Sequence, residues 1–181
     1  MEDSSSLLRS RQKQDKFISK LGHYLFDAGK QAVLIHRLAH FFYRSNLTLV
    51  ASLLRRINII LTGADIHPGA KFGKKVEMIH SVGVVIGEHV VVEDFCEIYG
   101  GVVLGGRGGT IEVDGQPRIG SNTVICSGAI VLGPISVGEN VTVGAGSVVL
   151  QSVPDNSLVA GVPATIKKRT ERTASTTNKE R

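Results

Sequence analysis

The feature that most constrains this chain is a six-residue repeat across residues 66–154. An aliphatic residue, often followed by glycine, returns every six positions, as at Ile86-Gly87 and Val143-Gly144. A short fixed period indicates one small unit stacked many times, because such a unit can bury its apolar side only against its neighbours. The positions that keep the period are Ile66, Phe72, Met78, Ile86, Val92, Ile98, Leu104, Ile119, Ile125, Val131, Val137, Val143 and Val149.

The repeat favours short strands over helices. A helix would need apolar spacings of three and four, and 21 glycines argue against it. Gly, Asn and Asp between the aliphatic positions suit corners where a positive φ is tolerated. We therefore predict a mainly β fold over residues 63–166, a parallel β-helix with three hexads in each triangular coil. The period slips by two residues at 81–84 and breaks in a loop at 105–118.

The two ends of the chain differ from the repeat in composition. Residues 1–16 and 167–181 are polar and charged, and they supply much of the net charge of +5. We expect both to be flexible extensions. A basic tail could contact nucleic acid or anionic lipid, but it lacks interleaved aromatic residues and any nucleic-acid motif. We expect no nucleic-acid partner, and a tail that attracts an anionic small molecule.

Residues 17–62 are predicted to be helical, as three helices near 17–26, 33–43 and 47–61. His36 and His40 stand four apart, a spacing that could bind zinc, but no third ligand is nearby. We expect packed or hydrogen-bonded histidines and no metal. The third helix could contact a membrane surface peripherally. Docking on the first coil is favoured, because that coil would otherwise expose a β edge.

Cysteine content and hydropathy exclude other classes. Cys96 and Cys126 lie in the repeat without CxxC spacing, so small buried thiols are favoured over a redox or metal role. No segment resembles a signal peptide, and no apolar run is long enough to cross a bilayer. These features predict a cytoplasmic protein without a transmembrane segment.

Several stretches resemble the serine acetyltransferases, which are hexapeptide-repeat acyltransferases. The resemblance covers about residues 30–168, and its combination of motifs is more specific than any single hexad. The matching stretches are HRLAH at 36–40, ADIHPGAKFG at 64–73, IHSVG at 79–83, VIGE at 85–88, VLGG at 103–106, VGAGSVVL at 143–150 and VAGVPA at 159–164.

The resemblance implies properties that the repeat itself could not predict. It implies a bacterial protein, a left-handed coil, which is an exception to the usual crossover rule, and acetyl-CoA as donor. It also implies homotrimers with active sites in the clefts between neighbours. Full-length members carry a longer N-terminal helical region that pairs trimers into hexamers. Because that region is short here, we expect a trimer.

His80 matches the family's catalytic histidine, and Asp65 matches the aspartate that orients it. A hydroxyl acceptor must lose its proton as it attacks the thioester, and histidine can take that proton at neutral pH. The plainer interpretations also stand: His80 as a solvated loop residue and Asp65 as a turn cap.

The acceptor contacts depart from the family pattern. Where the family has an aspartate beside the catalytic histidine, this chain has Ile79, and Gly115 and Gln116 replace the Arg and His that contact the substrate carboxylate. Arg107 or Arg118 could substitute for the missing cation. The family's helical aspartate for the substrate amine has only Asp15 as a loose counterpart.

These departures favour a sugar or surface-glycan acceptor, in a polysaccharide pathway, over L-serine. Asp114 and Gln116 could hydrogen-bond neutral hydroxyls. L-serine O-acetylation in cysteine biosynthesis remains the alternative. A non-catalytic β-helix scaffold is a further alternative, as is a carbonic-anhydrase-like metal protein using His67, His80 and His89.

The donor is expected to lie along segments of small residues, because glycines let a thin pantetheine arm approach the backbone. Basic residues after the last coil could pair with CoA phosphates. Corner glycines and a solvated tail are the plainer interpretations. The expected donor residues are Gly105, Gly106, Ser127, Gly128, Ala129, Ala145, Gly146, Lys167 and Lys168.

Overall fold

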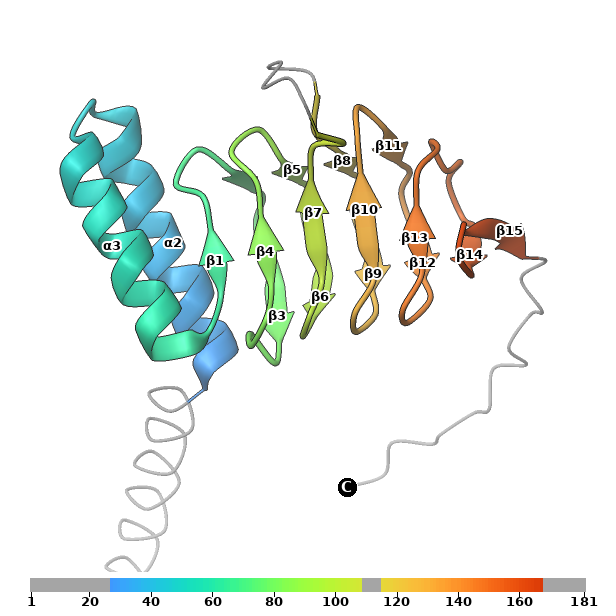
Figure 1. Cartoon of the computed structure of the whole chain (residues 1–181), viewed down its shortest axis with the longest axis horizontal. Coiled ribbons are helices and arrows are strands. Elements are labelled where there is room, and N and C mark those ends of the chain that lie inside the picture. Colours follow the sequence, from blue (N-terminus) through green and yellow to red (C-terminus); the bar gives the residue numbers. More distant parts are fainter. Residues whose placement is uncertain (1–26, 109–114, 168–181) are drawn as a thin grey trace, which may run out of the picture.

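The computed structural model describes residues 27–108 and 115–167, and within them a helical hairpin precedes a stack of short parallel strands (Figure 1). The hairpin consists of α2 (Ala28–Arg44) and α3 (Thr48–Thr62). Successive strands rotate through three sheets, so each strand up to β13 pairs with the strand three places along the chain, whereas β14 pairs with β12 and with β15. The predicted parallel β-helix with a helical N-terminal element is confirmed.

The strands of each sheet are short. The first sheet contains β1 (Asp65–Ile66), β4 (Val85–Ile86), β7 (Val103–Gly105), β10 (Ile130–Leu132) and β13 (Val148–Val149). The second contains β2 (Lys71–Phe72), β5 (Val91–Val92), β8 (Arg118–Ile119) and β11 (Ser136–Val137). The third contains β3 (Glu77–Ile79), β6 (Glu97–Tyr99), β9 (Val124–Ile125), β12 (Thr142–Val143), β14 (Leu158–Ala160) and an antiparallel β15 (Thr165–Lys167).

The register explains both interruptions of the repeat. Ile86 pairs with Leu104, one regular coil of eighteen residues away. Ile66 pairs with Ile86, twenty residues away, because the corner around His80 contains two extra residues. Leu104 pairs with Val131, twenty-seven residues away, because the loop after β7 adds nine. Both insertions lie between strands, so the aliphatic positions stay aligned on either side.

The aligned aliphatic side chains form one continuous core inside the coils. Ile98, Leu104, Ile119 and Ile125 are all 0% exposed. Phe72 is the exception among the repeat positions, because it is only partly buried and packs against the ring of His36 from α2. Burial of this kind contributes about 25 cal/mol per Å² of apolar surface and is the main source of stability in such a stack.

The corners use left-handed backbone, as predicted. Between the second and third sheets a column of non-glycine residues has positive φ, and three of them are asparagines: Lys75, Phe95, Asn122, Asn140 and Asn156. Between the third and first sheets the corresponding column is made of glycines: Gly63, Gly83, Gly101, Gly128 and Gly146. His80 joins this second corner with φ 62°, as a residue of the two-residue insertion.

The hairpin packs on the first coil. Asp27 begins α2 by accepting a hydrogen bond from Lys30 N (3.1 Å), so the helix starts five residues before the predicted 33. Gly63 ends α3 in the left-handed conformation. Gly29 of α2 lies directly against the Met78 carbonyl of β3, where a Cβ would clash. The predicted first helix, 17–26, lies outside the described residues.

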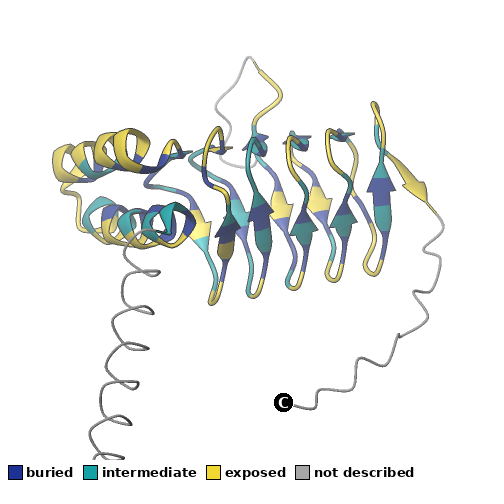
Figure 2. Ribbon diagram, turned by 90° about the horizontal axis from the view of Figure 1, so that it is seen from below, coloured by how far each residue is buried: buried dark blue, intermediate teal, exposed yellow. Residues whose placement is uncertain are grey.

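The outer side of the hairpin stays exposed, as Figure 2 shows. It is largely apolar, and its most exposed side chains are Leu34, Leu38, Phe41, Leu49, Leu53, Ile60 and Leu61. No helix within residues 27–108 or 115–167 is long and apolar enough to cross a bilayer.

The two thiols lie within the coils. Cys96 is buried and donates to the Gly120 carbonyl (3.1 Å), whereas Cys126 is only partly buried. Burial is the largest cause that raises the pKa of both thiols.

Candidate functional site

His80 lies on a corner that is hydrogen-bonded to the end of α3 and to the residue after it. It follows β3, where the chain turns from the third sheet to the first. The neighbouring Ser81 is buried and donates its hydroxyl to the Thr62 carbonyl (2.6 Å), and Gly83 N donates to the Gly63 carbonyl (3.1 Å). His80 itself is exposed and has a positive φ, which is uncommon for a side chain with a Cβ. A strained, exposed imidazole on a rigid corner is a candidate for function.

Asp65 begins β1, one coil below the His80 corner, and it is bound by the helical hairpin. Arg55 of α3 holds its carboxylate with two hydrogen bonds, from Nε to Oδ1 (2.6 Å) and from Nη2 to Oδ2 (2.9 Å). Both side chains are about one-third exposed. Among the described residues, no hydrogen bond or ion pair joins Asp65 to His80, so the expected pair is not formed in this structure.

Ile79 lines a cavity between α2 and β3. The cavity has a volume of about 280 Å³, and its lining includes Lys30, Arg37 and Glu77. Arg37 donates to the Gly73 carbonyl, and Lys30 forms an ion pair with Asp27 (3.1 Å). Ile79, which stands where the family has an aspartate, therefore shares this cavity with Lys30 and Arg37 of α2. Asp15 lies outside the described residues.

The loop at 105–118, which the sequence predicts to contact the acceptor and which is called the acceptor loop below, follows the carboxyl end of β7 in the first sheet, whereas His80 precedes the amino end of β4. These two ends of the strands are the two edges of the first sheet referred to below. Gln116, just before β8, accepts a hydrogen bond from His89 N through Oε1 (3.1 Å) and lies over Gly87, where a Cβ would clash with it. Arg118 forms an ion pair with Glu93 (2.9 Å), and Arg107 lies against Gly133. Asp114 lies outside the described residues.

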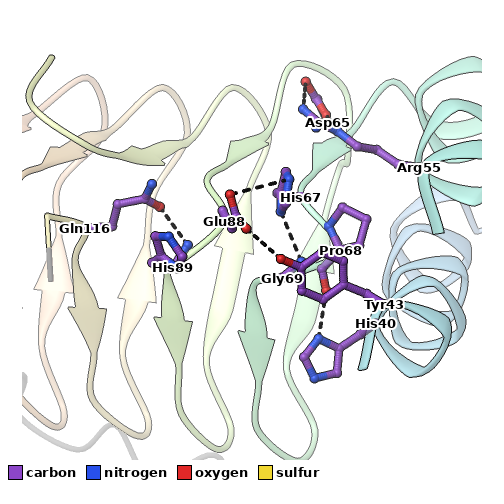
Figure 3. A network of polar contacts seen from close by, with 10 residues as sticks. All are labelled: His40, Tyr43, Arg55, Asp65, His67, Pro68, Gly69, Glu88, His89 and Gln116. Carbon is purple, nitrogen blue, oxygen red and sulfur yellow. Dashed lines mark hydrogen bonds and ion pairs between the residues drawn. The ribbon is translucent and has the colours of Figure 1, made fainter. Parts of the chain in front are cut away.

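A second polar network lies on the same edge as Gln116 (Figure 3). Tyr43 of α2 donates to Glu88 Oε1 (2.6 Å), and the other carboxylate oxygen lies 3.8 Å from His67 Nε2. His67 Nδ1 accepts from Gly69 N (3.1 Å), which places the ring proton of the neutral form on Nε2. Nearby, His40 Nδ1 lies 2.7 Å from the Pro68 carbonyl. These contacts tie the hairpin to the first two coils.

The network shifts the pKa of its members. The hydrogen bond from Tyr43 is the largest cause that lowers the pKa of Glu88, and the same bond raises the pKa of Tyr43. Burial is the largest cause that lowers the pKa of His67, and Glu88 opposes it. Both nitrogens of His67 are therefore occupied or faced by a carboxylate, which leaves no free base there.

The three histidines named for a metal alternative do not converge. His67 and His89 lie between the first and second sheets, whereas His80 lies at the other edge of the first sheet. Within the described part of the chain, no group of three His, Cys, Asp or Glu side chains could hold a metal ion.

The expected donor residues are divided between the same two edges. Gly128 and Gly146 belong to the glycine column that continues from the His80 corner. Gly105 and Gly106 lie at the start of the acceptor loop, on the other edge. Ser127 and Ala145 are exposed beside the column, Ala129 is buried, and Lys167 is exposed at the end of β15. Lys168 lies outside the described residues.

The sequence did not predict the roles of Arg55, Tyr43 and Glu88. In the sequence, Arg55 and Arg56 interrupt the apolar residues of the helix predicted near 47–61, and Glu88 lies in the stretch 85–88 that resembles the family. The signal that could have found Arg55 is its charge, shared only with Arg56, in a largely apolar helix that packs on the first coil.

The comparison with family models and curated proteins gives consistent matches. Residues 116–151 match the model of the bacterial transferase hexapeptide (six repeats). A serine acetyltransferase of Synechococcus elongatus is 46% identical over 76% of this chain and 56% of its own length. One from Staphylococcus aureus is 46% identical over 66% of its length, and one from Staphylococcus epidermidis is 43% identical over 80% of this chain and 68% of its own. The chain thus spans about 56–68% of these relatives.

Solved structures agree with these matches. Serine acetyltransferase of Brucella abortus in complex with coenzyme A has a TM-score of 0.76 and 43% identity, covering 77% of this chain and 56% of that one. A serine acetyltransferase in complex with cysteine has a TM-score of 0.76 and 36% identity, covering 80% of this chain and 56% of that one.

Proposed function

The chain belongs to the serine acetyltransferase family of hexapeptide-repeat proteins, and from this premise we propose that it transfers an acetyl group from acetyl-CoA to the hydroxyl of L-serine. The relatives' names support this acceptor better than the sugar or surface glycan expected from the sequence. The structure of a relative with coenzyme A supports the donor.

The observation that carries the proposal is His80, an exposed imidazole in left-handed backbone at the family's catalytic position. In the proposed reaction His80 accepts the hydroxyl proton while the serine oxygen attacks the thioester carbonyl. It returns that proton to the sulfur as the carbon–sulfur bond breaks, so CoA leaves as a thiol and the acetyl group stays on oxygen. The Ser81–Thr62 hydrogen bond fixes the corner and thus reduces the freedom that His80 must lose.

Asp65 is proposed to stabilise the charged form of His80. Its two oxygens each accept one bond from Arg55, and each keeps a lone pair that can accept another. Arg55 therefore holds the carboxylate in place and leaves it able to accept a hydrogen bond from His80. The pair is completed if the imidazole turns toward β1 when the acceptor binds.

The placement of the candidate residues supports a site that is shared between copies of the chain. His80 and Asp65 lie at one edge of the first sheet, and the acceptor loop with Gln116 lies at the other. The cleft between neighbours in a cyclic trimer would bring one edge of one copy against the other edge of the next. We therefore propose a homotrimer whose sites take His80 from one copy and the acceptor loop from the next.

A neutral sugar acceptor is the second candidate, and a specific observation favours it. Ile79 stands where an ammonium-binding aspartate is expected, and Gln116 supplies a neutral amide in place of a histidine. These residues would suit hydroxyls rather than a zwitterion. The two candidates share the donor, the base and the reaction type, and differ only in the acceptor.

The test is the release of free thiol from acetyl-CoA by the purified chain, residues 1–181, with L-serine and with a panel of nucleotide sugars as acceptors. We expect turnover with L-serine, and a loss of about 10²-fold or more in kcat for His80→Ala. The control is Glu139→Ala, which changes an exposed side chain between β11 and β12 and should retain activity. Turnover with sugars alone would favour the second candidate, and turnover unchanged by His80→Ala would refute the role of His80.

A further inference from the structure

A groove runs along the second sheet beside the acceptor loop. It has a volume of about 350 Å³, which lies within the range of small-molecule sites. Its lining includes Lys71 from β2, His89 from the corner before β5, and Gln116 and Arg118 from the end of the loop. Three of these four side chains are basic, so the groove suits an anionic group.

The charges in the groove are not equally available. Arg118 is engaged by Glu93 through two contacts, at 3.0 and 2.9 Å. Lys71 is exposed, and no hydrogen bond or ion pair to its ammonium occurs among the described residues. The backbone N–H of His89 is bonded to Gln116, but its ring has no hydrogen-bond partner in the described part of the chain. Lys71 and the His89 ring are therefore the donors left for a ligand.

Gln116 places His89 beside the family's acceptor position. The glutamine occupies the position where family members carry a histidine, and its carbonyl oxygen is bonded to the backbone of His89 itself, 3.1 Å away (Figure 3). Positions 89 and 116 are far apart in sequence and adjacent in space, because the strands that follow them, β5 and β8, pair in parallel with Val91 opposite Arg118. The imidazole that is missing at position 116 is thus supplied by His89, which lies next to it in space.

We propose that His89, assisted by Lys71, binds the carboxylate of the acceptor. This proposal rests on the proposed function and adds its specificity: the acceptor is a small hydroxy acid or amino acid with a free carboxylate, not a neutral sugar. Charge-assisted hydrogen bonds from an ammonium and an imidazole replace the Arg and His contacts that Gly115 and Gln116 cannot make. In the proposed site both residues contact the carboxylate and not the reacting hydroxyl, so both should affect binding rather than the chemical step.

The test has a kinetic arm. In the wild-type chain and in His89→Ala, KM for L-serine and for acetyl-CoA are measured together with kcat. We expect the KM for L-serine to rise about tenfold or more, with kcat and the KM for acetyl-CoA nearly unchanged. The double variant His89→Ala/Gln116→His should recover most of the loss, which a merely structural role of His89 would not permit. Lys71→Ala should raise the KM for L-serine by a smaller factor. Lys74→Ala, which changes an exposed lysine outside the groove, should leave that KM unchanged.

The second arm measures binding without turnover, by calorimetry with L-serine and with its methyl ester, in which the carboxylate charge is absent. The wild-type chain should prefer L-serine by about tenfold or more, and His89→Ala should lose that preference. Equal binding of acid and ester by the wild-type chain overturns the carboxylate site, whether or not the chain turns over. If the chain binds L-serine more tightly than the methyl ester but transfers no acetyl group, the carboxylate site is supported and the proposed function is refuted.

Discussion

His36 should make the stability of this protein fall sharply in mild acid. The side chain is 2% exposed in α2, and its ring lies 4.4 Å from that of Phe72. Burial is the largest cause that lowers its pKa from 6.5 to about 3, and the charges of His40 and Arg37 add to it. The folded chain therefore holds His36 neutral, whereas the unfolded chain protonates it below pH 6.5.

The sign and size follow from that difference. Because the folded pKa is depressed, the contribution of His36 is fully present above pH 6.5 and is lost progressively as the pH falls toward 3. At pH 5 nearly all unfolded molecules and about one folded molecule in a hundred carry the proton. That imbalance lowers the free energy of unfolding by about 2 kcal/mol relative to pH 7.5.

The perturbation that isolates this effect is His36→Leu, which removes the titrating group but keeps an apolar side chain of similar size. Among the described residues the ring's Nδ1 has no hydrogen-bond partner, so the loss of that atom costs little. Urea unfolding at pH 7.5 and pH 5.0, at one protein concentration, gives the free energy for both chains. Other groups, such as His67, titrate alike in both and cancel. The wild type should lose about 2 kcal/mol more than His36→Leu, and equal losses in the two chains would refute the reasoning.

Three further predictions concern packing and charge, all measured by urea unfolding at pH 7.5. Gly29→Ala should destabilise by about 1–3 kcal/mol, because the new methyl group meets the Met78 carbonyl; an unchanged midpoint would contradict that close packing. Leu104→Ala, fully buried inside the coils, should cost about 2–5 kcal/mol. Arg55→Gln should change stability by less than about 1 kcal/mol, because its bridge to Asp65 is one-third exposed; a larger loss would make that bridge a structural element.

The fold was predictable because the repeat acts through burial alone. Every six residues one aliphatic side chain must point inward, and the same requirement holds in each coil, so Ile98 or Ile125 could be placed without knowledge of its neighbours. The start of α2 was placed five residues too late, since its first turn buries Gly29 and Ala32, which carry little hydrophobic signal. The capping role of Asp27 was the local signal available.

The candidate site was less predictable, because its contacts depend on which coils meet. His80 and Asp65 could be named from the resemblance, but the ion pair between Arg55 and Asp65 depends on how α3 packs on the first coil. The contact between His89 and Gln116 depends on the register set by the nine-residue insertion. No periodicity of the sequence carries that information.

The position of the insertions follows from the same physics that makes the core regular. An extra residue within a strand would turn the next aliphatic side chain outward and cost its burial, about 1.5–3 kcal/mol for each position displaced. Extra residues are tolerated only at corners, where the chain can leave the coil and return in register, as it does around His80 and after Gly105. A stack of this kind therefore projects its irregular, polar segments from its edges. Two edges of one sheet carry them here, which is why the complete site is expected where the edges of two copies meet.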